Sequence, residues 1–131
     1  MITVFNHIRP RFFFYGRMVK AKGVDTLLQA FSMLPSNIQN KHPLTLVGDG
    51  KEAQELQGFA KELKVFDNCT FLKWANSSQI IGYLQQNSIA VLPSREESFG
   101  NTMLESLATG IPLISTQAGS IPEVVGPHAN L

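Results

Sequence analysis

The sequence lacks the cysteine pairs that would cross-link a small fold, and it lacks histidines at the spacing of metal ligands. Cys69 is its only cysteine, which excludes an internal disulfide and favours a reducing compartment. The three histidines, His7, His42 and His128, are scattered without the spacing of metal ligands. No apolar run approaches the roughly 20 residues of a membrane helix, and the first residues do not resemble a signal peptide.

The sequence also lacks a charge of one sign. Eleven basic residues stand against ten acidic ones, and a net charge of +1 creates no field that would attract nucleic acid or an anionic membrane. The 131 residues, 44% of them hydrophobic, are enough for one domain with its own core. We therefore expect a single cytoplasmic domain.

What is present is an alternation of short apolar runs with helical patterns. The runs do not alternate with polar residues, as is typical of strands buried on both faces, and they cover residues 12–15, 44–47, 70–72, 89–92 and 112–115. Apolar stripes and stop signals predict helices over 24–34, 53–63, 78–86 and 100–108, and a capping box at Ser120 predicts one more. The sequence therefore predicts an α/β fold: a doubly wound, Rossmann-like sheet of about five parallel strands with flanking helices.

The two ends of the chain suggest a piece of something larger. Residues 1–11 resemble the last part of an interdomain connection, and the predicted domain covers 12–131. A doubly wound half usually carries one more strand and a closing helix. We therefore expect the domain to be truncated at its C-terminus.

The loop after the first predicted strand carries two cations between glycines. Gly16 and Arg17 are followed five residues later by Lys22, which precedes Gly23. Ligands of open parallel sheets bind beyond the carboxyl ends of the strands, where two fixed cations could grip a diphosphate. The alternative is a pair of solvated surface charges.

After the fourth predicted strand, two carboxylates surround a glycine at a predicted strand-to-helix turn. Glu97 lies in the loop, Gly100 near the start of the helix, and Glu105 inside it. The backbone amides of a helix start favour an anion, whereas carboxylates suit hydroxyl groups. A ligand with both, such as a nucleotide-sugar, is the natural expectation.

Two further loops at this edge allow more than one interpretation. Residues 48–53 match the dinucleotide pattern G-x-G-x-x-A, but the acidic residue expected about 20 positions later is missing, and Asp49 with Glu52 equally suggests a helix cap. In the third loop, Lys73 and Trp74 could form a nucleobase pocket, whereas Trp74 could equally close one edge of the core.

Four motifs in this order resemble the retaining group 1 glycosyltransferases. They are Gly16-Arg17 with Lys22-Gly23, the segment 46–50, the segment 93–105, and the segment 119–123. The match is to the C-terminal, donor-binding domain of these two-domain GT-B enzymes and spans about residues 13–125. Serine at 120, where glycine is common, and Lys73-Trp74 after the third strand depart from the pattern, and the second departure leaves base recognition open.

The resemblance implies a role for each matching residue. Arg17 and Lys22 would hold the diphosphate and stabilise it as it leaves, Glu97 would contact the transferred sugar, and Glu105 would bind the ribose hydroxyls. The backbone of Ser98, Phe99, Gly100 and Asn101 would cradle phosphate and sugar. The family uses no metal motif, so neither a metal nor another cofactor is expected, and the donor would be a UDP-, GDP- or ADP-sugar.

The resemblance also implies a partner for this domain. The family's N-terminal domain, which binds the acceptor, has no counterpart in these residues, and any attachment to the inner face of a membrane would come through it. We therefore expect little or no transfer by this chain alone. Three alternatives stay open: a natural half-length subunit with a separate acceptor subunit, a related GT-B epimerase or phosphorylase, and a dinucleotide-binding protein.

Overall fold

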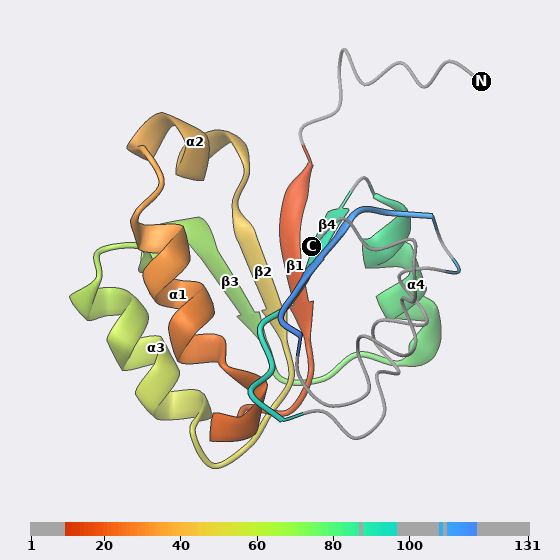
Figure 1. The fold of residues 1–131 in the computed structure, drawn as a ribbon, viewed down its shortest axis with the longest axis horizontal. Coiled ribbons are helices and arrows are strands. Elements are labelled where there is room, and N and C mark those ends of the chain that lie inside the picture. Colours follow the sequence, from red (N-terminus) through yellow and green to blue (C-terminus); the bar gives the residue numbers. More distant parts are fainter. Residues whose placement is uncertain (1–9, 87, 97–107, 109, 118–131) are drawn as a thin grey trace.

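A computed structural model describes residues 10–86, 88–96, 108 and 110–117. These residues form one five-stranded sheet in which all neighbouring strands are parallel, in the order β3-β2-β1-β4-β5 (Figure 1). The strands are β1 (Arg11–Tyr15), β2 (Leu44–Val47), β3 (Cys69–Leu72), β4 (Ser88–Leu92) and β5 (Leu113–Ser115). The predicted parallel sheet is confirmed, and each strand begins and ends within one residue of its predicted bounds.

Helices cover both faces of the sheet. In Figure 1, α1 (Val24–Ser32) and α3 (Ala53–Glu62) lie on one side and α4 (Ser77–Gln85) on the other. These three helices confirm the apolar stripes of the sequence, although α1 ends two residues before the predicted position. The predicted helices over 100–108 and from Ser120 onward lie outside the described residues, apart from residue 108.

The central strand shows why both faces must be covered. Along β1, Phe14 packs into the cluster under α1 and α3, whereas Phe13 packs into the cluster under α4. Successive residues of a strand point to opposite faces of the sheet, and both of these side chains are buried. Two layers of helices around a buried sheet are therefore what this strand requires.

A short helix that apolar periodicity does not predict follows α1. Helix α2 (Ser36–Lys41) contains one buried residue, Gln39, whose amide nitrogen donates to the carbonyl oxygens of Phe31 (3.1 Å) and Leu34 (2.9 Å). The bonds join α2 to carbonyl groups in the last turn of α1 and just after it. Helix α2 is therefore fixed by hydrogen bonds to α1 rather than by an apolar face.

The carboxyl ends of the strands gather at one edge, the lower one in Figure 1. The 3-10 helix η1 (Lys20–Lys22) lies after β1 at this edge, whereas η2 (Phe66–Asn68) precedes β3 at the opposite edge. In the part of the chain that the structure describes, no helix has the length and apolar character needed to cross a membrane.

Candidate functional site

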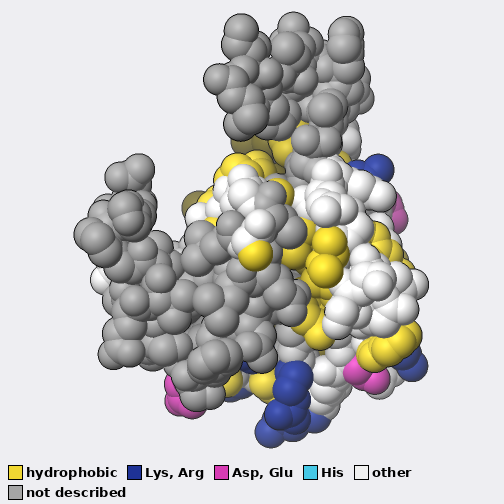
Figure 2. Space-filling view, turned by 90° about the vertical axis from the view of Figure 1, so that its right-hand side faces the viewer, with side chains coloured by type: hydrophobic (Ala, Val, Ile, Leu, Met, Phe, Trp, Pro, Cys, Tyr) yellow, Lys and Arg dark blue, Asp and Glu magenta, His cyan; other side chains and the backbone are white. Residues whose placement is uncertain are grey.

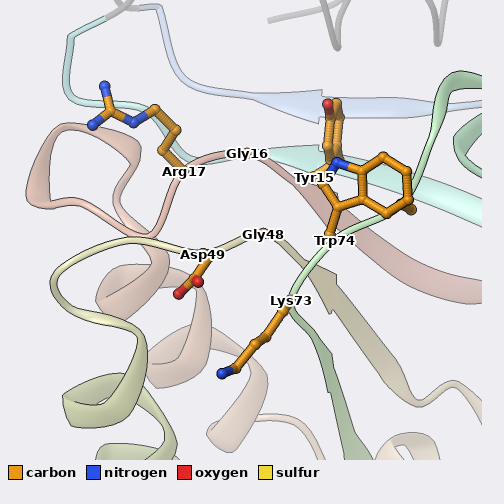
Figure 3. Close-up of a pocket in the computed structure, with 8 residues that line it drawn as sticks. Tyr15, Gly16, Arg17, Gly48, Asp49, Lys73 and Trp74 are labelled. Carbon is orange, nitrogen blue, oxygen red and sulfur yellow. The ribbon is translucent and has the colours of Figure 1, made fainter.

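The loops after β1, β2 and β3 line a pocket of about 250 Å³ at the carboxyl edge of the sheet. Figure 3 shows Trp74 and Tyr15 on one side of it and Arg17 on the other, with Asp49 and Lys73 below. Gly16, Gly48 and Ala75 complete the lining. The structure thus brings Arg17, predicted to hold a diphosphate, to the same hollow as Lys73 and Trp74, predicted to bind a base.

Backbone hydrogen bonds join the first two of these loops. The N–H of Met18 donates to the carbonyl oxygen of Asp49 (2.9 Å), and the N–H of Glu52 donates to the carbonyl oxygen of Met18 (3.0 Å). Met18 is itself buried in the core. Arg17 therefore leaves a backbone that is anchored on the core and on the neighbouring loop.

Gly48 explains why the second loop resembles a dinucleotide fingerprint. Its φ of +150° is a conformation that residues with a side chain rarely adopt, and a Cβ added here would overlap the carbonyl oxygen of Gly16. In the fingerprint, such close backbone approach serves the pyrophosphate of a cofactor. Here the space is filled by the neighbouring loop, which counts against the dinucleotide interpretation.

The capping interpretation of this loop is wrong. Glu52 is the N-cap residue of α3, and no side chain makes a capping hydrogen bond there. Asp49 instead accepts a hydrogen bond from the N–H of Gly50 (2.8 Å), inside the turn. Its carboxylate therefore stabilises the turn between β2 and α3.

Trp74 does not close the core, since it is 75% exposed. Its neighbour Ala75 is buried, and Asn76 caps the N-terminus of α4 with a reciprocal pair of hydrogen bonds to Gln79 (2.8 and 2.9 Å). Each of these bonds satisfies a backbone N–H at the start of the helix. The loop is thus held immediately after Trp74, and the indole ring is exposed to solvent at the rim of the pocket.

Lys22 lies on η1 and does not line this pocket. Its turn faces the loop that follows β4: the N–H groups of Arg95 (2.7 Å) and Glu96 (3.3 Å) both donate to the carbonyl oxygen of Ala21. The chain that leads into Glu97 therefore passes directly beside the turn that carries Lys22.

Arg95 is a residue of this edge that the sequence reasoning missed. Its guanidinium group donates through two nitrogens to the Asp25 carboxylate (2.9 and 3.0 Å) and also to the carbonyl oxygen of Lys20 (2.8 Å) and the hydroxyl of Thr26 (3.0 Å). The pair spans 70 positions of sequence. No local pattern predicts the contact, and the sequence shows only that Arg95 directly precedes Glu96 and Glu97.

The Asp25 carboxyl gives a testable consequence of this contact. The hydrogen bond from Arg95, with a smaller charge effect of the same group, holds the pKa of Asp25 below its ordinary value of 3.8. We expect Arg95→Gln to raise the pKa of Asp25 toward 3.8, as measured by NMR titration of its side-chain carboxyl carbon. The stabilisation from the pair is present above 3.8 and is lost as the pH falls through the lowered pKa of the folded state.

The stability difference between wild type and Arg95→Gln should therefore shrink on acidification below 3.8. Arg11→Gln is the matched control, because Arg11 is also exposed but begins β1 at the opposite edge of the sheet. An Asp25 pKa that stays unchanged in Arg95→Gln would contradict the assigned contact.

The remaining predicted site residues lie outside the described part of the chain. They are Glu97, Ser98, Phe99, Gly100, Asn101 and Glu105. The described structure reaches Glu96 before these residues and includes β5 after them. Just beyond β5, the N–H of Thr116 donates to the carbonyl oxygen of Leu92 (3.2 Å). Figure 2 shows basic side chains along the lower edge of the molecule, which is the carboxyl edge of the strands in Figure 1.

Groups that could support other chemistry are accounted for within the described ranges. Cys69 begins β3, and burial raises the pKa of its thiol to about 12, so the thiol stays protonated near neutral pH. His42 caps α2, and its Nδ1 lies 2.9 Å from the carbonyl oxygen of Pro10. Among the same residues, no three His, Cys, Asp or Glu side chains gather where they could hold a metal ion.

Comparison with known proteins connects this geometry to one family. The family model described as "Glycosyl transferases group 1" matches residues 2–130. The chain is 36% identical over 106 residues to the N-acetyl-alpha-D-glucosaminyl L-malate synthase of Bacillus anthracis, which is 81% of this chain and 27% of that protein.

Solved structures share the fold. Sucrose-phosphate synthase from Thermosynechococcus elongatus superimposes with a TM-score of 0.78 at 28% identity, over 90% of this chain and 30% of that one. The C-terminal domain of a group 1 family protein from Francisella tularensis gives a TM-score of 0.73 at 22% identity, over 95% of this chain and 68% of that one. The chain spans 27–30% of the length of the curated relatives that it matches.

Proposed function

The chain belongs to the group 1 glycosyltransferases and has the Rossmann-like fold of a GT-B domain, and on this premise we propose that it is the donor-binding domain of a hexosyltransferase. The whole enzyme would transfer a hexosyl group from a nucleotide-sugar to an acceptor hydroxyl with retention, in the synthesis of a polysaccharide or glycoconjugate. The relative from Bacillus anthracis is named as the synthase of N-acetyl-alpha-D-glucosaminyl L-malate, a compound that joins a sugar to malate.

One observation carries the proposal for this chain. The N–H groups of Arg95 and Glu96 both bind the carbonyl oxygen of Ala21, next to Lys22. Two segments that are remote in sequence, one carrying Arg17 and Lys22 and the other leading into Glu97, therefore meet at the carboxyl edge of the sheet, where open α/β sheets bind ligands.

The proposed roles follow from the chemistry of the donor. Arg17 and Lys22 would hold the diphosphate and stabilise its charge as it departs. Glu97 would contact the sugar, Glu105 the ribose hydroxyls, and the backbone of residues 98–101 the phosphate. In the transfer, the bond from the anomeric carbon to the phosphate oxygen breaks, the acceptor oxygen bonds to the same face, and the departing phosphate oxygen takes the acceptor proton. This scheme requires no metal ion.

A thermal-shift panel tests the proposal. We expect UDP, GDP or ADP, or a sugar conjugate of one of them, to raise the melting temperature of the chain, because a ligand that binds only the folded state stabilises it. NAD belongs in the same panel, since it separates a dinucleotide site from a donor site. Stabilisation by NAD alone, or by none of the nucleotides, would remove the proposal.

Trp74 offers a second test, directed at the base. An exposed indole at the rim of the pocket can stack on a nucleobase, and such stacking contributes about 1–3 kcal/mol per base. We expect Trp74→Ala to weaken the preferred nucleoside diphosphate about tenfold and to leave inorganic pyrophosphate unaffected, as measured by calorimetry.

Met33→Ala is the control for this substitution. Met33 is equally apolar and 84% exposed, but it caps the C-terminus of α1, away from the pocket. Both variants should melt close to wild type, because neither side chain is part of the core. Unchanged nucleotide affinity in Trp74→Ala would show that the base does not bind against this ring.

A further inference from the structure

The pair formed by Arg95 and Asp25 holds two loops together at the carboxyl edge without being part of the pocket. The guanidinium nitrogens of Arg95 donate to four acceptor oxygens, which belong to Lys20, Asp25 and Thr26. Asp25 lies in the first turn of α1, immediately after the turn of Lys22. A single side chain from the loop after β4 thus grips the turn on both sides of Lys22.

The backbone reinforces the same alignment. Gly23 has a φ of +69°, and a Cβ added to it would overlap the carbonyl oxygen of Pro93. Together with the hydrogen bond from the Arg95 N–H to Ala21, this close approach forms a seam between residues 20–23 and residues 93–96. The position of Lys22 relative to the chain that enters Glu97 is therefore set by this seam.

Arg95 is placed to align this seam rather than to bind an anion itself. Its charge is already matched by the Asp25 carboxylate in a two-pronged contact, a geometry that lysine cannot reproduce. Both side chains are more than 40% exposed, and exposed ion pairs contribute little to folding stability. Loss of the pair should consequently change alignment more than stability.

We infer that Arg95 and Asp25 are positioning residues for the diphosphate: they hold the turn that carries Lys22 against residues 93–96 of the loop after β4. The inference rests on the proposed donor-binding function. It adds a pair of residues that affects binding through the position of Lys22, without contacting the ligand. Disruption of the pair should weaken binding of the diphosphate and spare the nucleoside, because the base pocket is built from the loops after β1, β2 and β3.

A double-mutant cycle tests this inference with the 131-residue chain. The ligands are whichever of UDP, GDP and ADP binds wild type most tightly and its parent nucleoside. Binding can be followed by calorimetry and by the fluorescence of Trp74, the only tryptophan. We expect Arg95→Gln and Asp25→Asn each to weaken the diphosphate about fivefold, well below the roughly hundredfold cost of a 1 Å misplacement at a reacting centre. The double variant should lose no more than either single one.

Three controls separate positioning from general damage. Arg11→Gln and Asp67→Asn remove exposed charges from the opposite edge and should change neither affinity. Arg95→Lys keeps the charge but not the two-pronged contact and should lose about as much affinity as Arg95→Gln. Nucleoside affinity should remain at the wild-type value in every variant.

Each other outcome overturns the inference. Losses that multiply in the double variant would show that the two residues act independently, and equal losses for nucleoside and diphosphate would show general damage to the fold. Wild-type affinity for the diphosphate in Arg95→Lys would show that the two-pronged contact with Asp25 is not needed. Wild-type binding that persists in all variants removes this inference alone, whereas a wild type that binds no nucleoside diphosphate removes the proposed function as well.

Discussion

Replacing Lys22 by alanine should weaken the binding of a nucleoside diphosphate by about 1.5–3 kcal/mol, which is roughly 10- to 150-fold in affinity. The ammonium group would bind the diphosphate as a charge-assisted donor, and this class of contact is about twice as strong as a neutral hydrogen bond. Lys22 is partly buried on η1, beside the chain that enters Glu97. Calorimetry with the preferred nucleoside diphosphate measures the loss.

Arg17→Ala should cost a similar amount, since its guanidinium group can bind phosphate oxygens through two nitrogens. Lys41→Ala is the control, because Lys41 is an exposed cation at the end of α2, remote from the pocket. Equal affinity in wild type, Lys22→Ala and Arg17→Ala would show that these cations are solvated surface charges, the alternative that the sequence leaves open.

Replacing Gly48 by alanine should have the largest effect on stability. The added Cβ would overlap the carbonyl oxygen of Gly16, and the φ of +150° would strain any residue other than glycine. Such strain and crowding each cost about 1–3 kcal/mol. We expect the melting temperature to fall by roughly 10 °C, because the two loops must separate to make room.

The matched control for this substitution is Gly58→Ala. Gly58 lies exposed within α3, and a Cβ added there would meet nothing within 4 Å. Alanine is favoured over glycine in a helix by about 0.5–1 kcal/mol, so this variant should melt slightly above wild type. If Gly48→Ala melted like Gly58→Ala, the close approach of the two loops would be wrong.

The strands and three of the helices could be predicted because their sequences carry the signal of burial. Phe13 and Phe14 are consecutive apolar residues that pack on opposite faces, which is the pattern of a central parallel strand. The stripe through Leu27, Leu28 and Phe31 likewise predicts the buried face of α1. Where the buried residues are apolar and recur with a regular period, the sequence alone is sufficient to predict the element.

Helix α2 could not be predicted in this way, because polar contacts fix it. Its one buried side chain, Gln39, would be assigned to the surface by composition, and its hydrogen bonds to α1 become visible only when both helices are in place. Asp49 illustrates the same limit: its spacing from Glu52 indicates a cap, yet its carboxylate accepts a hydrogen bond from the nearer N–H of Gly50.

The candidate site was partly predictable. The carboxyl-edge rule places Arg17, Lys73 and Trp74 near one another without any knowledge of side chains, and the pocket confirms this placement. The rule could not decide whether Trp74 is buried or exposed, since both suit an aromatic residue after a strand. Nor could it find Arg95 and Asp25, whose contact depends on how two loops cross. The binding roles of Arg17, Lys22, Lys73 and Trp74, like those of Glu97 through Glu105, stay predictions.

The joined backbones of the first two loops determine how this domain could be re-engineered. Met18 shares hydrogen bonds with Asp49 and Glu52, so a graft of residues 16–23 alone would leave donor and acceptor groups of residues 48–52 without partners. A working chimera would have to exchange both segments as one block. Residues 73–79, which contain both partners of the Asn76 and Gln79 cap, form a separate segment that could be exchanged on its own.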